Sequence, residues 1–382
     1  MIQRPRDRTR HPDPQVDGEL DRLMALLPPE NQDLLREIVV RALRVSEHAL
    51  DRGELKILAA TLRDFSRSFA VFGRHRDRKK ISIFGSARTP EGSPRYELAH
   101  ELARQLAERG YMVITGAGPG IMRAGNAGAG RENSFGVSID LPFEPEANDV
   151  IRGDPKLVHF KYFFTRKLSF VKESDAIVLF PGGFGTLDEG FEALTLLQTG
   201  KCDPLPVIMM DVPGSNYWPA WERYLRENLV EKELVSPADR HLFVMTSSIG
   251  RALEEIERFY FCYHSLRYVD EYCVLRLRRR PAPSLLATLN ARYRDLLASG
   301  DYQLLDGPHP AEASESPEVR ALPRIGFHFV RRSFGRLRRL IDEVNLGESE
   351  EVGVAPSPPP PEGGHLFVPP DGNGNGNGEP RD

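Results

Sequence analysis

The chain has 382 residues and a formal net charge of -4 at pH 7; 40% of its residues are hydrophobic and 28% are charged. These values are typical of an ordinary globular protein, and the small net charge argues against a general nucleic-acid-binding protein, which would usually carry a basic excess. The three cysteines have no paired spacing, so neither a disulfide framework nor a cysteine-based zinc site is expected. No apolar run could span a bilayer, and the Arg- and Pro-rich start is not a secretory signal, so we expect a cytoplasmic protein without membrane contact.

The N-terminal part of the chain divides into two segments. Residues 1–18 are expected to be disordered, and a helical pattern follows over residues 19–77. Apolar residues recur there at three- and four-residue steps, in stretches separated by breaks such as Pro28-Pro29. We therefore expect a helical extension in front of the main domain.

From residue 79 the pattern changes, because short β-branched runs alternate with amphipathic helices. Strands are expected at 81–84, 111–115, 135–139, 176–180, 206–210 and 242–246. Helices are expected at 95–109, 121–129, 162–173, 187–199, 218–230 and 249–260. Such alternation means crossover units and a mostly parallel sheet, with ligands at the carboxyl ends of the strands. The predicted fold class is α/β, a doubly wound Rossmann-like parallel sheet over residues 78–262.

Beyond this domain the regular alternation is lost. Residues 263–346 are expected to form a small α+β appendage, with strands at 272–277 and 325–330 and helices at 285–297 and 331–344. The tail, residues 347–382, contains a proline run and an Asn-Gly repeat that cannot build a core. We expect this tail to be disordered.

Two predicted strands end in turns of small residues. The first turn is Gly85-Ser86-Ala87, in which Ser86 offers a hydroxyl, although small residues are common at any such turn. The second contains Gly116, Gly118 and Gly120, and a glycine-rich turn before a helix exposes backbone N–H groups to an anion. Its spacing does not fit the dinucleotide fingerprint G-x-G-x-x-G, although Asp140 follows at about 20 residues, as a ribose-binding acid would. An NAD-dependent oxidoreductase therefore remains a weak alternative.

The third turn carries the strongest signal. Pro181-Gly182-Gly183-Phe184-Gly185-Thr186 follows a predicted strand, and a helix is expected from about Leu187. The three glycines permit positive φ and leave no Cβ between the backbone N–H groups and a phosphate. Thr186 can donate its hydroxyl to the same phosphate. Because no lysine stands where a triphosphate-binding loop needs one, the turn favours a monophosphate.

Two readings of Thr186 and Glu189 stay open on the residues alone. Thr-Leu-Asp-Glu fits a capping box, with Thr186 as the N-cap and Glu189 reaching back to its N–H. Alternatively, Glu189 is a functional carboxylate, useful where a sugar develops positive charge as its bond to a base breaks. Upstream, the charges of Arg166-Lys167 have a plain alternative as a solvated basic pair.

Arg166-Lys167, followed by Pro181-Gly182-Gly183-Phe184-Gly185-Thr186-Leu187-Asp188-Glu189, resembles the LONELY GUY (LOG) family, once labelled "lysine decarboxylase". That family is marked by an Arg-Lys pair and the motif P-G-G-x-G-T-x-x-E. The resemblance runs over about residues 79–260 and excludes the helical extension, the appendage and the tail. The loop at 141–148 resembles the longer bacterial branch, whose members usually carry an acid where this chain has Arg123.

The resemblance implies a phosphoribohydrolase, which hydrolyses the N-glycosidic bond of a nucleoside 5′-monophosphate to a free base and ribose 5-phosphate. It implies a catalytic pair, Arg166 and Glu189, and no metal or cofactor. It also implies a homo-oligomer that binds a nucleotide; the small net charge argues against a nucleic-acid partner. The alternative is a non-catalytic nucleotide-binding module, like the carriers of molybdenum cofactor. The expected substrate-binding residues are Ser86, Gly118, Gly120, Lys167, Gly182, Gly183, Phe184, Gly185, Thr186, Asp188 and Thr195.

Overall fold

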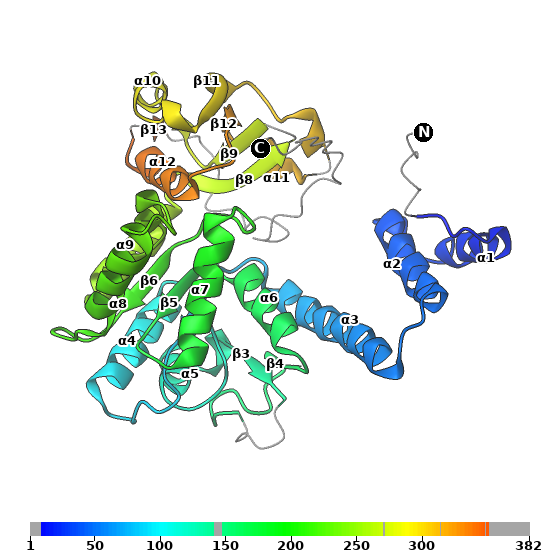
Figure 1. The fold of residues 1–382 in the computed structure, drawn as a ribbon, viewed down its shortest axis with the longest axis horizontal. Coiled ribbons are helices and arrows are strands. Elements are labelled where there is room, and N and C mark those ends of the chain that lie inside the picture. The colour runs from blue at the N-terminus through cyan, green and yellow to red at the C-terminus, as the bar shows by residue number, and fades with distance from the viewer. Residues whose placement is uncertain (1–8, 141–146, 270–271, 314, 348, 351–382) are drawn as a thin grey trace. The chain divides into compact units, whose positions relative to one another are not determined.

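The structure is a computed structural model that describes residues 9–140, 147–269, 272–313, 315–347 and 349–350. The chain divides into two compact units, one up to Arg63 and one from Asp64 onwards. Figure 1 shows the path of the chain through its helices and strands. Residues 1–8 and 351–382, which we expected to be disordered, lie outside the described residues. The prediction that disorder begins at residue 347 was wrong for residues 349–350, which pair with residues 280–281 as a short antiparallel strand.

The first unit contains the predicted helical extension. Its helices are α1 (Pro14–Met24), α2 (Gln32–Arg44) and the beginning of α3 (Arg52–Phe72), which continues into the second unit. Helix α1 begins earlier than expected because the Asp13 side chain accepts hydrogen bonds from two backbone N–H groups of the first turn. The prediction that disorder extends to residue 18 was therefore wrong for its last five residues.

A seven-stranded parallel sheet forms the centre of the second unit. The strand order is β4-β3-β2-β1-β5-β6-β7, and every pairing is parallel. This confirms the predicted doubly wound α/β fold. Six of these strands were predicted, whereas β4, a four-residue edge strand, was not. The strands are β1 (Lys80–Phe84), β2 (Met112–Thr115), β3 (Ser134–Ile139), β4 (Leu157–Phe160), β5 (Ala176–Leu179), β6 (Val207–Met210) and β7 (Val244–Thr246).

Helices cover both faces of this sheet, because alternate side chains of each buried strand point to opposite faces. Ile81 and Ile83 of β1 pack into one core, whereas Phe84 packs into the other. The first core is completed by α4 (Pro94–Glu108), α5 (Ile121–Ala129) and α9 (Ile249–Phe259). The second is completed by α6 (Phe163–Glu173), α7 (Phe184–Gln198), α8 (Tyr217–Leu225) and the end of α3.

The strand order places a topological switch point between β1 and β5. From β1 the chain adds β2, β3 and β4 on one side, and then returns to add β5, β6 and β7 on the other. The loops that follow β1 and β5 therefore run in opposite directions and leave a crevice at the carboxyl ends of these strands. This crevice is where ligands bind in folds of this kind.

The appendage is a four-stranded antiparallel sheet of order β11-β12-β9-β8, with helices packed on one face. Strands β8 and β11 were not predicted, and the end of the predicted helix 285–297 is instead a short 3₁₀ turn and the start of β11. The elements are β8 (Tyr263–Val269), β9 (Tyr272–Leu277), β10 (Arg280–Pro281), α10 (Pro283–Arg292), β11 (Leu297–Leu305), α11 (Pro317–Arg320), β12 (Arg324–Phe329), α12 (Phe334–Leu346) and β13 (Ser349–Glu350).

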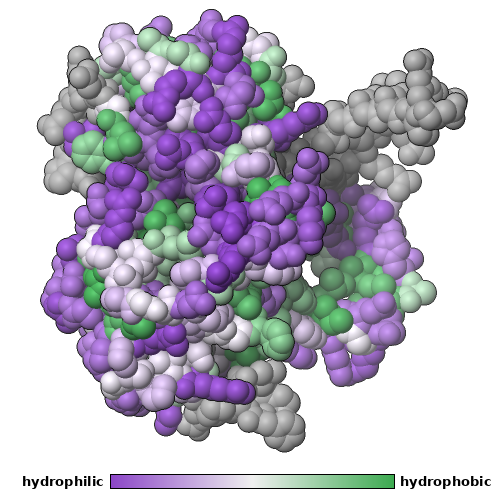
Figure 2. Space-filling view, turned by 60° about the vertical axis from the view of Figure 1, so that its left-hand side comes forward, coloured by the Kyte–Doolittle hydropathy of each residue, from purple (hydrophilic) through white to green (hydrophobic). Residues whose placement is uncertain are grey.

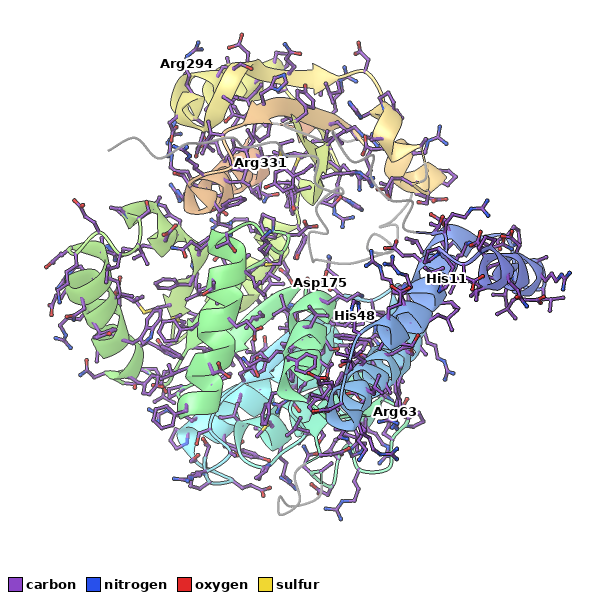
Figure 3. The ribbon with its side chains drawn as sticks, turned by 45° about the vertical axis from the view of Figure 1, so that its right-hand side comes forward. His11, His48, Arg63, Asp175, Arg294 and Arg331 are labelled. Carbon is purple, nitrogen blue, oxygen red and sulfur yellow. The ribbon has the colours of Figure 1, made fainter. Side chains whose placement is uncertain are left out.

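The appendage packs on the end of the α/β domain that is opposite to the crevice. The ring of Phe334 in α12 fills the space where Gly200, just after α7, would carry a side chain, and Gly200 has a φ of +64°. Arg338 of α12 also pairs with Glu255 of α9, with its Nη2 2.6 Å from Oε1. Figure 3 shows Asp175, which precedes β5, on this side of the sheet.

The face shown in Figure 2 is mainly hydrophilic, with small hydrophobic areas scattered among charged residues. Within the described residues, no helix combines the length and the apolar character that crossing a bilayer would need.

Candidate functional site

Backbone hydrogen bonds join the three glycine-containing turns at the crevice. The Ser86 N–H donates to the Pro181 carbonyl oxygen at 3.1 Å, and the Ile121 N–H donates to the Ser86 carbonyl oxygen at 3.1 Å. Gly120 has a φ of +63°, and a Cβ on it would overlap the Ser86 carbonyl, so only glycine fits there. The structure therefore brings together the three turns that the sequence singled out.

Helix α7 begins directly on the third turn. Phe184 is its first residue and Gly183 is its N-cap, without a capping side chain. The expected start at Leu187 was therefore wrong, and so was the capping-box reading. Glu189 lies in the second turn of the helix, too far along it to reach back to the N-terminus. The Thr186 side chain instead packs against Gly182, where an added Cβ would overlap its hydroxyl.

The N-terminus of α7 is open at two of its glycines. A Cβ added to Gly183 or Gly185 would meet no heavy atom within 4 Å. Gly182, Gly183 and Gly185 do not have positive φ, although glycine would permit it. Their role is space rather than backbone freedom, because their lack of side chains leaves the first N–H groups of α7 accessible to an anion. The Phe184 side chain beside them is 94% exposed.

A lysine and three carboxylates lie where α6 meets α7. Lys167 Nζ is 2.7 Å from Glu192 Oε2, 2.9 Å from Asp188 Oδ2 and 3.6 Å from Glu189 Oε2. Burial lowers the pKa of Lys167, but its hydrogen bonds to Glu192 and Asp188 outweigh this and the pKa is raised overall. Arg166-Lys167 is thus not a solvated basic pair, because Lys167 is enclosed by acids.

Glu189 is the buried member of this cluster, with 7% of its surface exposed. Burial raises the pKa of its carboxyl group, while the charges of Lys167 and Arg166 act in the opposite direction and only partly offset it. A buried carboxylate with a raised pKa beside an open helix N-terminus is typical of a functional site.

Arg166 lies against the end of β2. Its Nη2 is 3.2 Å from the position that a Cβ on Gly116 would take. Its guanidinium carbon lies 5.4 Å from the centre of the Phe170 ring. Because its charge also acts on Glu189, the two predicted catalytic side chains share one electrostatic environment between α6, α7 and the β2 turn.

A buried polar network fixes the second turn. Asn148 Nδ2 donates to the carbonyl oxygens of Ala117 at 3.0 Å and Gly118 at 3.1 Å, and to Asn126 Oδ1 at 3.0 Å. The Met122 side chain folds back over Gly118, where an added Cβ would be 2.6 Å from its methyl carbon. This turn is therefore rigid, and Met122 covers one side of it.

Arg123 stands where longer relatives usually carry an acid, and its partners lie outside the cluster around Lys167. Its Nε is 2.8 Å from Asp149 Oδ1 and its Nη1 donates to the Tyr96 hydroxyl at 2.6 Å. It also pairs with Glu91 at 2.8 Å. Arg123 therefore fixes the segment that follows the loop at 141–146, and that loop lies outside the described residues.

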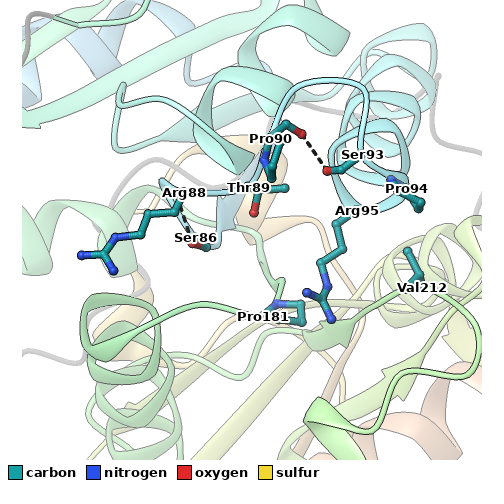
Figure 4. A pocket seen from close by; sticks show the side chains of 9 residues that line it. All are labelled: Ser86, Arg88, Thr89, Pro90, Ser93, Pro94, Arg95, Pro181 and Val212. Atoms are coloured by element: carbon teal, nitrogen blue, oxygen red, sulfur yellow. Dashed lines mark hydrogen bonds between the residues drawn. The ribbon is translucent and has the colours of Figure 1, made fainter.

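A cavity of about 420 Å³ opens at the switch point, beside the glycine turns. Figure 4 shows Arg95 pointing between Pro181 and Val212, whereas Arg88 points away from them. Arg95 Nε is held by Asp211 Oδ1 at 2.6 Å. Because Ser86 and Pro181 form part of its wall, this cavity adjoins the third turn.

Two predicted residues lie away from this centre. Thr195 is exposed on α7, six residues beyond Glu189, which is roughly 9 Å along a helix axis. Asp140, the acid of the dinucleotide alternative, follows β3 and its Oδ1 is 3.1 Å from His159 Nδ1. Within the described residues, no hydrogen bond joins Thr195 or Asp140 to the cluster around Lys167.

Sequence reasoning missed three residues that support the site. Glu192 could have been found, because it is four residues from Asp188 and so shares its helix face. Asn148 and Tyr217 carry no local signal. The Tyr217 hydroxyl donates to the Gly182 carbonyl oxygen at 2.6 Å from a helix that follows the next strand.

Comparisons with known proteins agree with the motifs. Residues 120–256 match the family model described as "Possible lysine decarboxylase". The chain is 27% identical over 185 residues to the probable cytokinin riboside 5′-monophosphate phosphoribohydrolase LOGL6 of Oryza sativa subsp. japonica, covering 47% of this chain and 71% of that protein. It is 28% identical over 185 residues to the cytokinin riboside 5′-monophosphate phosphoribohydrolase LOG1 of Arabidopsis thaliana, covering 47% and 84%.

Among solved structures, the chain is similar to the molybdenum cofactor binding protein from Rippkaea orientalis. The identity is 21% and the TM-score 0.33, and the match covers 47% of this chain and 96% of that one. The residues that the family model matches include Arg166-Lys167 and the turn at 181–189. Through its α/β domain, over about half of its length, the chain is similar to the LONELY GUY family.

Proposed function

We propose that this chain is a nucleoside 5′-monophosphate phosphoribohydrolase. The observation that carries the proposal is the position of Glu189, a buried carboxylate in the second turn of a helix whose N-terminus is open at Gly183 and Gly185. A phosphate at the N-terminus and a carboxylate one turn further along suit the two ends of a ribose 5-phosphate. The names of the plant relatives support the same chemistry.

The α7 N-terminus is the proposed phosphate site. The first N–H groups of a helix lack partners within the helix, and the helix dipole adds a favourable field for an anion. The absence of side chains at Gly183 and Gly185 lets phosphate oxygens approach these groups closely. Thr186, in the first turn of the same helix, adds a hydroxyl in this proposal.

Glu189 and Arg166 are the proposed catalytic residues. Water adds to C1′ of the ribose as the bond to the base nitrogen breaks, and the base leaves with a proton, so the products are ribose 5-phosphate and the free base. Positive charge develops on the ribose, and an adjacent ionised carboxylate stabilises it. Glu189 supplies that carboxylate, and Arg166, beside the β2 turn, supplies a positive charge close to it.

The test is base release from a panel of purine, pyrimidine and cytokinin nucleoside 5′-monophosphates, followed by chromatography. We expect release from at least one of them, and loss of release with retained nucleotide binding in Glu189→Gln and Arg166→Ala. Asp140→Asn is the matched control, because Asp140 pairs with His159 outside the acid cluster. Tight binding without release of any base would contradict hydrolysis and would favour a carrier of nucleotides.

A further inference from the structure

The Lys167 ammonium is held by two carboxylates and stands close to a third. Its distances to Glu192 and Asp188, 2.7 and 2.9 Å, are those of strong charge-assisted hydrogen bonds. Its distance to Glu189, 3.6 Å, is too long for a hydrogen bond but within the range of an ion pair. The lysine side chain is 16% exposed, so solvent screens this arrangement less than it would a surface pair.

Glu192 and Asp188 hold Lys167 by hydrogen bonds, whereas Glu189 is affected only by its positive charge. Glu192 is the better shielded of the two anchors, with 31% of its side chain exposed against 61% for Asp188. Since the hydrogen bonds of Lys167 go to these anchors, the Glu189 oxygens keep their acceptor positions for a ligand or water. We propose that Lys167 is a positioning residue that keeps Glu189 ionised, and that Glu192 holds Lys167 in place for this purpose.

The proposal rests on the proposed function, in which Glu189 acts as a carboxylate. The charged groups that face Glu189 are Arg166 and Lys167 from α6 and Asp188 and Glu192 from α7. The two acids and burial raise the pKa of Glu189, and the two cations lower it. Removing Lys167 leaves only one cation against these effects, so the carboxyl group holds its proton to higher pH.

The first test reads Glu189 directly and needs no activity. Glutamate labelled with carbon-13 at the side-chain carboxyl is titrated by NMR, with Glu189→Gln identifying the signal. An opposite charge at this distance typically changes a carboxyl pKa by about 1 or more. We expect Lys167→Met to raise the pKa of Glu189 by that amount. Glu192→Gln removes an acid that raises this pKa as well as an anchor of Lys167, so its two effects oppose each other and its shift should be smaller. An unchanged titration of Glu189 in Lys167→Met would overturn the proposal, whether or not the protein releases bases.

The second test separates positioning from substrate binding. In assays of base release, the acidic limb of the pH profile of kcat/KM should lie at higher pH in Lys167→Met than in the parent. Below that limb we expect kcat/KM to fall about tenfold, and at high pH we expect it to recover. A rise in KM that is equal at every pH would instead identify Lys167 as a phosphate ligand. Lys172→Met on the same helix is the control, because Lys172 pairs with Glu173 at 2.7 Å and lies over the Phe69 ring. If Lys167→Met does not fold, Lys167→Gln tests the same prediction, because it removes the charge and keeps a side chain that can donate hydrogen bonds to the acids.

Discussion

The Tyr217 hydroxyl donates a 2.6 Å hydrogen bond to the carbonyl oxygen of Gly182, and so a residue of α8 fixes the peptide that leads into α7. Tyr217→Phe removes this hydrogen bond, worth about 1 kcal/mol, and leaves the ring in place. We expect weaker binding of nucleoside monophosphates, by roughly fivefold, with little change in the melting temperature. Calorimetric titration measures the affinity. Tyr224→Phe, on the exposed side of α8, should bind like the parent, and equal affinity in both variants would mean that the hydrogen bond does not support the site.

The glycines of the third turn should differ in what they do. Gly185→Ala places a methyl group in open space in the first turn of α7, where alanine stabilises a helix by about 0.5–1 kcal/mol relative to glycine. We expect an unchanged or higher melting temperature and a clear loss of affinity for inorganic phosphate and for nucleotides. Gly182→Ala should lower the melting temperature, because its methyl group would overlap Thr186. Retained phosphate affinity in Gly185→Ala would move the phosphate site elsewhere.

Glu189→Gln should raise stability at neutral and alkaline pH while it abolishes base release. The pKa of Glu189 is raised by folding, so its favourable contribution is complete below the unfolded-state pKa and is lost as the pH rises through the folded-state pKa. Above that range the buried carboxylate opposes folding, and the neutral amide of glutamine does not. We expect the melting temperature of Glu189→Gln to exceed that of the parent at pH 8 and to approach it at acidic pH. If Glu189→Gln is less stable than the parent at pH 8, the attraction of Lys167 and Arg166 for the carboxylate outweighs the cost of burying it. Glu257→Gln, on exposed α9 surface, serves as the control.

The appendage depends on a buried ion network. Glu312 Oε1 is 2.7 Å from Arg276 Nε and its Oε2 is 3.0 Å from Arg324 Nε, and these side chains are at most 5% exposed. Glu312→Ala leaves two guanidinium groups with fewer buried partners, which typically costs about 3–5 kcal/mol. We expect a marked fall in the denaturant concentration at which the appendage is half unfolded. Glu315 still reaches Arg276, so Glu315→Ala should cost less; a small effect of Glu312→Ala would show that water replaces the carboxylate.

Periodicity predicted most of the α/β domain, because its strands and helices are long enough to show a pattern. It missed the edge strand β4, Leu157–Phe160, in which His159 interrupts the apolar run that marks the central strands. In the appendage, β8 and β11 mix charged, polar and apolar residues and gain their partners only from distant segments. Strands of this kind are fixed by tertiary pairing rather than by local propensity.

The site was predictable as a set of motifs but not as an arrangement. The resemblance pointed to Arg166, Lys167 and Glu189. The four-residue pattern Thr-Leu-Asp-Glu, however, suggested a helix start three residues too late. Gly183 ends up as the N-cap because backbone pairing of the turn with Ser86 sets where α7 begins. The neighbours of Lys167 could not be read from spacing, since they require the packing of α6 on α7.

The contact between Phe334 and Gly200 makes two positions, separated by more than a hundred residues, dependent on each other. A ring at 334 tolerates no side chain at 200, and the φ of +64° at Gly200 independently favours glycine. To transplant this appendage to another α/β domain, protein engineers must therefore place a glycine at the position in that domain that corresponds to Gly200, or replace Phe334 by a smaller residue. The same pair gives a simple criterion for deciding which homologous sequences share this arrangement of appendage and helix.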